Sequence, residues 1–284
     1  MTRPFRFATV SAPTTPFAKL VEEAKAAEDS GFDLLVLPDF PTAISPIATL
    51  AGLAAHTATL RFSPLVTNAG LWRTDLLVRE FLTADQISRG RVEIGLGAGI
   101  GPGGPPKPLT HLREVVDALR TSLAGGANPP GWVSSPPILV AGSGDRLLGV
   151  GGELADIVGF AGPSPHPGSL GPGQVPLLSP AAADDRIAAV RAGAGDRFDQ
   201  IELNVGATVH LTGDRRAAAE EAQRIHSYLS ADEILASPKF LAGTTDEIAE
   251  QLLAHRERFG ISYFAILGVP PGDFAPVIAA LAGA

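Results

Sequence analysis

The sequence predicts one parallel (β/α)8 barrel, and three observations support this fold class. Short β-branched or apolar runs alternate with longer helical stretches along the whole chain, which is the pattern of parallel βα units. The strand-like runs are nearly continuously apolar, as expected of strands buried on both faces. The 284 residues are 45% hydrophobic and 18% charged, enough apolar material for one large core. A doubly wound open sheet is the alternative.

The first βα unit is the clearest. Residues 5–10 (FRFATV) form the expected strand, residues 17–30 carry helix formers at helical spacing, and Gly31 follows at the usual stop position. We expect the other strands at 34–39, 61–67, 91–97, 138–142, 157–161, 201–211 and 263–268. The matching helices are expected at 46–56, 75–88, 109–123, 146–154, 181–192, 244–259 and 274–282.

Two segments interrupt this alternation. Residues 162–180 are rich in Pro and Gly, and residues 214–230 have the composition of an additional helix between strands seven and eight. Both are too short to form a second domain, and we expect them to be additions around the barrel. The sequence therefore predicts a single domain over residues 1–284.

Charge and composition restrict the partners. The formal charge is −8 and no cluster of Lys and Arg is long enough to follow a phosphate backbone, so we expect neither nucleic acid nor a membrane surface as partner and favour a small molecule. The absence of Cys excludes disulfides, thiolate nucleophiles and sulfur-ligated metals. With no secretion signal and no apolar run of about 18 residues, a cytoplasmic location is expected.

The predicted strand ends carry few titratable groups. No lysine is placed for a Schiff base, and no pair of histidines is spaced for a metal site. A barrel mouth that is rich in glycine and poor in acids and bases is typical of enzymes whose cofactor carries the chemistry. This favours a redox enzyme with no metal.

A glycine-rich turn at 141–152 (AGSGDRLLGVGG) joins a predicted strand to a predicted helix. Free N–H groups at such a helix start suit a phosphate. Glycine-rich βα turns also serve tight geometry alone, and both readings remain open for this turn and for 95–104 (GLGAGIGPGG).

Four separated segments, 27–40, 61–99, 136–160 and 240–267, resemble the luciferase-like superfamily in order and spacing, especially its deazaflavin-dependent branch. The resemblance implies a (β/α)8 barrel that binds FMN or coenzyme F-420. It also implies a homodimer that transfers a hydride or activates oxygen.

Several residues match family positions around the cofactor. Leu65 and Val66 stand where the family has a bulge with a non-prolyl cis peptide under the flavin ring. The alternative for these residues is simple barrel core, and for Asp39 a helix or loop N-cap. The cofactor-binding residues that the resemblance implies are Asp39, Leu65, Val66, Thr67, Asn68, Gly97, Gly99, Ala141, Gly142, Ser143, Gly144 and Phe160.

Departures from the family pattern concern catalysis. Several relatives have a histidine where this chain has Phe40, so the expected proton donor is absent and no catalytic residue is assigned. His166 and His210 are fallback acids. The segments 100–108 and 124–137 are shorter than in typical relatives, which implies shortened lid loops and a more open mouth.

These observations rank four functions. The first is an oxidoreductase that uses reduced F-420 on a small apolar or carbonyl-bearing substrate. The alternatives are an FMN-dependent monooxygenase, a non-catalytic flavin-binding or ligand-binding barrel, and a cofactor-free lyase. Phe40, Leu71, Trp72 and Phe160 favour an apolar substrate if they face the mouth, and otherwise pack beneath a loop.

Overall fold

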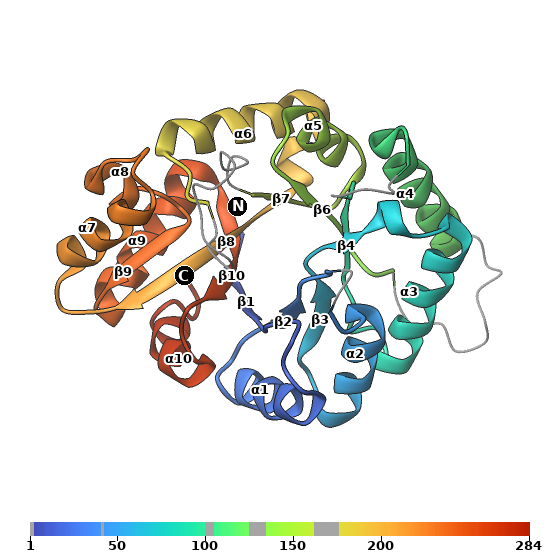
Figure 1. Cartoon of the computed structure of the whole chain (residues 1–284), viewed down its shortest axis with the longest axis horizontal. Helices are drawn as coiled ribbons and strands as arrows, with labels where there is room; N and C mark the ends of the chain where they lie inside the picture. The colour runs from blue at the N-terminus through green and yellow to red at the C-terminus, as the bar shows by residue number, and fades with distance from the viewer. Residues whose placement is uncertain (1–2, 41–42, 100–104, 125–134, 162–175) are drawn as a thin grey trace.

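The computed structural model describes residues 3–40, 43–99, 105–124, 135–161 and 176–284. In these ranges all strands are parallel and lie inside a ring of helices (Figure 1). The strands are β1 Arg6–Val10, β2 Leu34–Leu37, β3 Arg61–Pro64, β4 Thr67–Asn68, β5 Ile94–Gly97, β6 Ile138–Gly142, β7 Ile157–Phe160, β8 Glu202–Leu211, β9 Phe240–Gly243 and β10 Ile261–Leu267.

The α-helices follow the strands around the ring. They are α1 Phe17–Asp29, α2 Pro46–Leu53, α3 Thr74–Ser88, α4 Pro108–Ala124, α5 Asp145–Leu154, α6 Pro180–Ala194, α7 Arg215–Ile225, α8 Ala231–Leu235, α9 Thr245–Phe259 and α10 Pro271–Ala280. Short 3-10 turns are η1 Ala54–His56, η2 Ala69–Leu71 and η3 Gly195–Gln200. None of the described helices is both long and apolar enough to cross a membrane.

The sheet closes into a barrel at the third predicted strand, which is made of β3 and β4. The strands pair in the order β3-β2-β1-β10-β8-β7-β6-β5-β4, and β3 and β4 are two pieces of the same strand, separated by Leu65 and Val66. A further parallel bridge joins Phe62 to Val92. The predicted barrel is therefore confirmed, and the open-sheet alternative is wrong.

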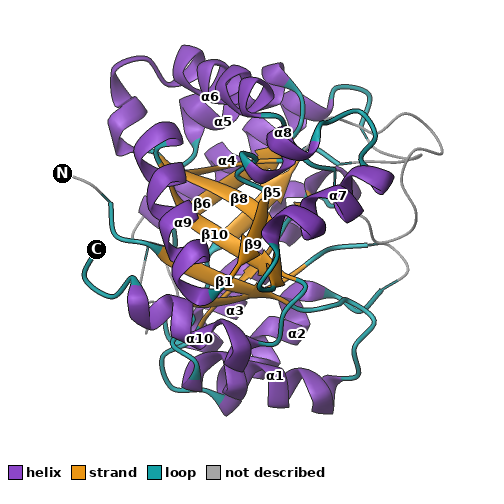
Figure 2. Ribbon diagram, turned by 90° about the vertical axis from the view of Figure 1, so that its left-hand side faces the viewer, coloured by secondary structure: helices purple, strands orange, loops and turns teal. Residues whose placement is uncertain are grey.

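The region between the seventh and eighth predicted strands, which are β8 and β10, differs from the prediction. The helix expected at 214–230 is α7, which ends already at Ile225. A further short helix that was not predicted, α8, begins after Ser230, which forms a reciprocal capping box with Glu233. The strand β9, which was not predicted, pairs with Thr208–Leu211 at the end of β8. Figure 2 shows α7 on the side of the molecule opposite both chain ends.

Two apolar layers hold the barrel. Alternate strand residues, among them Leu34, Val36, Leu139 and Ala265, fill its interior, while the intervening residues pack against the helices. This two-sided burial explains why the strand segments are mostly apolar.

Charged residues fill the end of the barrel where the strands begin. Arg6 pairs with Glu93 and, through Nη1, with Glu202 Oε2 at 2.6 Å, and its guanidinium lies 4.7 Å from the centre of the Tyr263 ring. Arg61 Nε reaches Glu93 Oε1 at 3.1 Å. This buried network plugs the N-terminal end, so a ligand has access to the barrel from the C-terminal ends of the strands.

Candidate functional site

The predicted site residues lie on neighbouring strands at the C-terminal end of the barrel. In the pairing of β4 with β5, Asn68 is opposite Gly97, and in that of β6 with β7, Ala141 is opposite Gly159. A Cβ on Gly97 would lie 3.5 Å from the carbonyl oxygen of Ala141. Residues 67–68, 97–99 and 141–144 thus form one wall of the mouth.

The bulge in this wall depends on two glycines. The peptide bond between Leu65 and Val66 is cis, as the resemblance implies. A Cβ on Gly97 would lie 2.8 Å from Val66 Cγ2, and one on Gly95 would lie 1.9 Å from the carbonyl oxygen of Pro64. The sequence analysis missed Gly95, although two glycines at i and i+2 on a strand are a signal of close backbone approach.

Asp39 connects two strands of the mouth. Its Oδ2 accepts a hydrogen bond from the main-chain N–H of Asn68 at 3.0 Å. It does not cap a helix, since the N-cap of α2 is Ser45. The half-buried carboxylate therefore orients β4 and is the acid nearest to the bulge along β2.

Thr67 and Asn68 occupy the two sides of the short strand β4. Thr67 is fully buried, and its Oγ1 has no hydrogen-bond partner among the described residues. Such a hydroxyl costs about 1–3 kcal/mol unless a water or ligand atom completes it. Gly99, at φ +99°, leaves the space that Asn68 needs, because a Cβ there would lie 2.2 Å from Asn68 Oδ1.

The turn after β6 leaves the start of α5 open. Gly144 is the N-cap and supplies no capping side chain, and no atom lies within 4 Å of where its Cβ would be. The main-chain N–H groups of the first helical turn point toward this space, as in anion sites. Gly142 has a packing role as well, since its Cβ would lie 2.7 Å from Leu147 Cδ2.

Arg186 of α6 joins this turn from a distant part of the chain. It forms an ion pair with Asp145, the first residue of α5. The pair offsets the negative charge that Asp145 places at the helix start, where an anion would otherwise be repelled. Sequence reasoning missed Arg186, because 41 residues separate the partners and no local pattern connects them.

The other candidates fall into different surroundings. Phe160 is only 2% exposed and packs between the strands and the helices, away from the open mouth. Leu71 and Phe40 are exposed, at 46% and 56%. His166 and residues 100–104 lie outside the described residues.

His210 and His111 also lie near this end of the barrel. His210 is on the part of β8 that pairs with β9, with its ring 4.8 Å from that of Phe240, and burial lowers its pKa. His111 Nε2 contacts the main-chain oxygens of Ala69 and Trp72 at 3.1 Å each. His111 therefore holds the loop after β4 in place.

The fold and the mouth agree with a comparison to known families. The description "Luciferase-like monooxygenase" belongs to the family model that matches residues 1–258. The chain belongs to this family.

Two curated relatives of this luciferase-like chain are both named 5,10-methylenetetrahydromethanopterin reductase. The protein from Archaeoglobus fulgidus is 27% identical over 246 residues, which is 80% of this chain and 70% of the relative. The protein from Methanolobus tindarius is 28% identical over 164 residues, 51% of this chain and 50% of the relative.

Solved structures confirm the luciferase-like fold. A coenzyme F-420-dependent tetrahydromethanopterin reductase from Methanopyrus kandleri superimposes with a TM-score of 0.73 at 17% identity, covering 98% of this chain and 97% of that one. An F-420-dependent secondary alcohol dehydrogenase gives 0.75 at 16%, covering 98% and 99%. A long-chain alkane monooxygenase gives 0.73 at 15%, covering 99% and 92%. These neighbours are oxidoreductases and monooxygenases.

The mouth of this luciferase-like barrel has features that suit a flat cofactor. The described ranges contain no group of three or more His, Asp or Glu placed to bind a metal ion. They do contain a glycine-lined wall with a buried unpaired hydroxyl and an open helix start. These features fit a flat ring system with a phosphate tail, because close backbone approach and free N–H groups are what such a ligand requires.

Proposed function

We propose that this chain is an oxidoreductase that uses reduced coenzyme F-420 to transfer a hydride to a small apolar or carbonyl-bearing substrate, or the oxidised coenzyme to take a hydride from it. The observation that carries the proposal is the wall formed by the bulge at Leu65 and Val66 beside the open start of α5. The relatives named 5,10-methylenetetrahydromethanopterin reductase and the F-420-dependent neighbours support it. When bound, the coenzyme supplies the hydride.

The chain's own residues bind and orient in this proposal. Val66 and Asn68, which are both partly exposed, would contact the ring system, and the fully buried Thr67 would support them from within the wall. The N–H groups at 143–145 would hold the phosphate, with Arg186 keeping Asp145 neutralised. Phe40, 56% exposed, offers no proton. We therefore propose that water or a substrate group moves the proton.

An FMN-dependent monooxygenase is the second candidate. The similarity of the fold to a long-chain alkane monooxygenase supports it. A helix start that holds a ribityl phosphate does not distinguish F-420 from FMN, since both cofactors carry that group. The cofactor must therefore be identified by binding.

The test is a titration of the apo protein with F-420 and with FMN, in which binding is monitored by tryptophan fluorescence. We expect F-420 to bind, and we expect Ser143→Asp to weaken its binding at least roughly tenfold, because the added carboxylate repels the phosphate. Gln200→Asp, which adds the same charge at an exposed site on η3, is the matched control and should bind as the wild type does.

Each outcome decides between the candidates. Binding of FMN alone would replace the F-420 proposal by the monooxygenase. If neither cofactor binds, this chain shares only its fold with the cofactor-dependent members of the family. If wild type and Ser143→Asp bind the cofactor equally well, its phosphate does not bind at the start of α5.

A further inference from the structure

Helices α5 and α6 pack backbone against backbone at a line of glycines. A Cβ on Gly152 would lie 2.3 Å from the carbonyl oxygen of Val190, and one on Gly193 would lie 2.0 Å from that of Gly149. No side chain fits between the helices at these points, because glycine alone allows so close an approach. The separation and the register of the two helices are therefore fixed.

The same register places Arg186 beside the start of α5. Asp145 is four residues before Gly149 on α5, and Arg186 is four residues before Val190 on α6. Each charged residue thus lies on the face of its helix that meets the other helix. Arg186 is level with the first turn of α5 and forms an ion pair with Asp145.

Arg186 has spare hydrogen-bond donors next to this helix start. A guanidinium carries five N–H groups, and the one hydrogen bond that the side chain of Arg186 makes to a described residue runs from Nη1 to Asp145. Its Nε is buried and has no partner among the described residues, so the terminal nitrogens are the part that can meet a ligand. The side chain remains 20% exposed.

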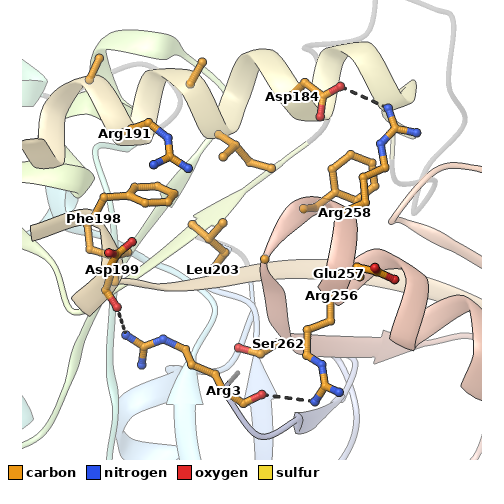
Figure 3. A pocket seen from close by; sticks show the side chains of 16 residues that line it. Arg3, Asp184, Arg191, Phe198, Asp199, Leu203, Arg256, Glu257, Arg258 and Ser262 are labelled. Carbon is orange, nitrogen blue, oxygen red and sulfur yellow. Dashed lines mark hydrogen bonds and ion pairs between the residues drawn. The ribbon is translucent and has the colours of Figure 1, made fainter. Parts of the chain in front are cut away.

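Other charged residues of α6 are engaged on another side of the helix. In Figure 3, Asp184 pairs with Arg258 of α9, at 3.2 Å, and Arg191 lies against the ring of Phe198. These residues line a cavity between α6, η3 and α9. In the part of the chain that the structure describes, the first residue of α5 is therefore the only carboxylate paired with Arg186.

Two kinds of donor adjoin Asp145. One is the set of main-chain N–H groups that begin α5, which the N-cap Gly144 leaves without a capping side chain. The other is the terminal N–H groups of Arg186. Both kinds of donor suit the oxygens of a phosphate, and a guanidinium forms the stronger, charge-assisted hydrogen bonds.

We propose that Arg186 is a direct ligand of the cofactor phosphate, in addition to neutralising Asp145. The inference rests on the proposed function and adds one side chain to the same site. The terminal nitrogens of Arg186 donate to the phosphate oxygens together with the N–H groups that begin α5. Because the packing of α5 on α6 already holds the guanidinium in place, little side-chain freedom is lost on binding.

The test is a fluorescence titration of wild type and Arg186→Gln with two pairs of ligands. F-420 is compared with 8-hydroxy-5-deazariboflavin, which has its ring and ribityl chain but no phosphate, and FMN is compared with riboflavin. Salt at about 0.5 M largely screens charges that are not in contact. We expect Arg186→Gln to bind the phosphorylated cofactor roughly tenfold more weakly and to bind the phosphate-free analogue as the wild type does.

The Asp145→Asn background separates the two roles of Arg186. If Arg186 contacts the phosphate, the double variant binds the cofactor roughly tenfold more weakly than Asp145→Asn alone. If Arg186 only neutralises Asp145, the two bind equally well and the proposal is wrong. Arg113→Gln, which removes an ion pair with Glu153 on the same helix, is the matched control and should bind as the wild type does.

Failure of this inference is distinguishable from failure of the proposed function. A wild type that binds neither F-420 nor FMN would overturn both. If the wild type binds a cofactor and Arg186→Gln binds it equally well, only the role of Arg186 is wrong. The same holds if Arg186→Gln weakens the phosphate-free analogue as much as the phosphorylated cofactor.

Discussion

At the scale of single residues, the mouth of the barrel depends on missing side chains more than on reactive ones. Gly95 and Gly97 admit the bulge between β3 and β4, and Gly99 admits the side chain of Asn68. A strand made of β-branched residues would satisfy the barrel core equally well, but it could not take the chain so close to its neighbour. The glycines therefore belong to the site, although none of them can react.

The stability of a Gly95 variant tests whether the bulge needs a glycine at this position. Gly95→Ala places a Cβ 1.9 Å from the carbonyl oxygen of Pro64, so the bulge must move, and we expect a loss of about 1–3 kcal/mol in the free energy of unfolding. Gly272→Ala, where no atom lies within 4 Å, is the matched control and should not destabilise. Urea unfolding measures both, and equal midpoints for Gly95→Ala and wild type would show that the bulge is not fixed by this contact.

At the scale of elements, the buried face of helix α9 contributes both to core packing and to the pH dependence of stability. Its capping box, Thr244 with Glu247, starts the helix, and Gly260 at φ +70° ends it. Ile248, Leu252, His255 and Phe259 form the buried stripe at helical spacing. A histidine in such a stripe must remain neutral to be buried.

The pH dependence follows from that burial. Burial, with the nearby Arg258, lowers the pKa of His255 to about 4, below its value of about 6.5 in the unfolded chain. The unfolded state therefore binds more protons between these values. The contribution of His255 to stability is fully present above pH 6.5 and is lost as the pH falls to 4, by up to about 3 kcal/mol.

The prediction is that His255→Leu makes the urea midpoint less sensitive to pH between 6.5 and 4. The same change at His56, an exposed residue at the end of η1, serves as control and should leave the sensitivity as in the wild type. An unchanged pH profile for His255→Leu would mean that this side chain is not buried neutral.

At the scale of the whole molecule, the two ends of the barrel have different tasks. Buried ion pairs of Arg6 close one end, while the predicted cofactor residues lie at the other end. The outer surface carries an exposed apolar residue on α3, Ile87 at 55% exposure. We expect this helix and its neighbours to form the face of a homodimer, as the family resemblance implies.

The dimer is tested by sedimentation velocity at micromolar protein. Wild type should sediment as a dimer, and Ile87→Glu should shift it toward monomer, because a charge at an apolar interface is desolvated without a partner. Leu253→Glu, at a 38% exposed residue of α9, should remain dimeric. A monomeric wild type would contradict the expectation, and an Ile87→Glu variant that remains dimeric would place the interface elsewhere.

The local pattern of the sequence was sufficient to predict most of the barrel, because helix spacing, apolar strands and Gly or Pro stops are properties of neighbouring residues. It also predicted the strand-end positions where the site residues lie. It failed where the signal was short or mixed. The helix expected at 214–230 ends at Ile225, the capping box at Ser230 starts a short helix that was not predicted, and the four-residue strand β9 resembles any short apolar run.

Contacts between distant residues were decided only by the tertiary structure. The closing bridge of Phe62 to Val92, the ion pair of Arg186 with Asp145 and the approach of Pro64 to Gly95 depend on strand register and on helix packing. The sequence by itself therefore determined the class of fold and the end of the barrel at which the candidate site residues lie. Tertiary structure determined which side chains meet there, because residues far apart in the chain leave no local pattern that records their contact.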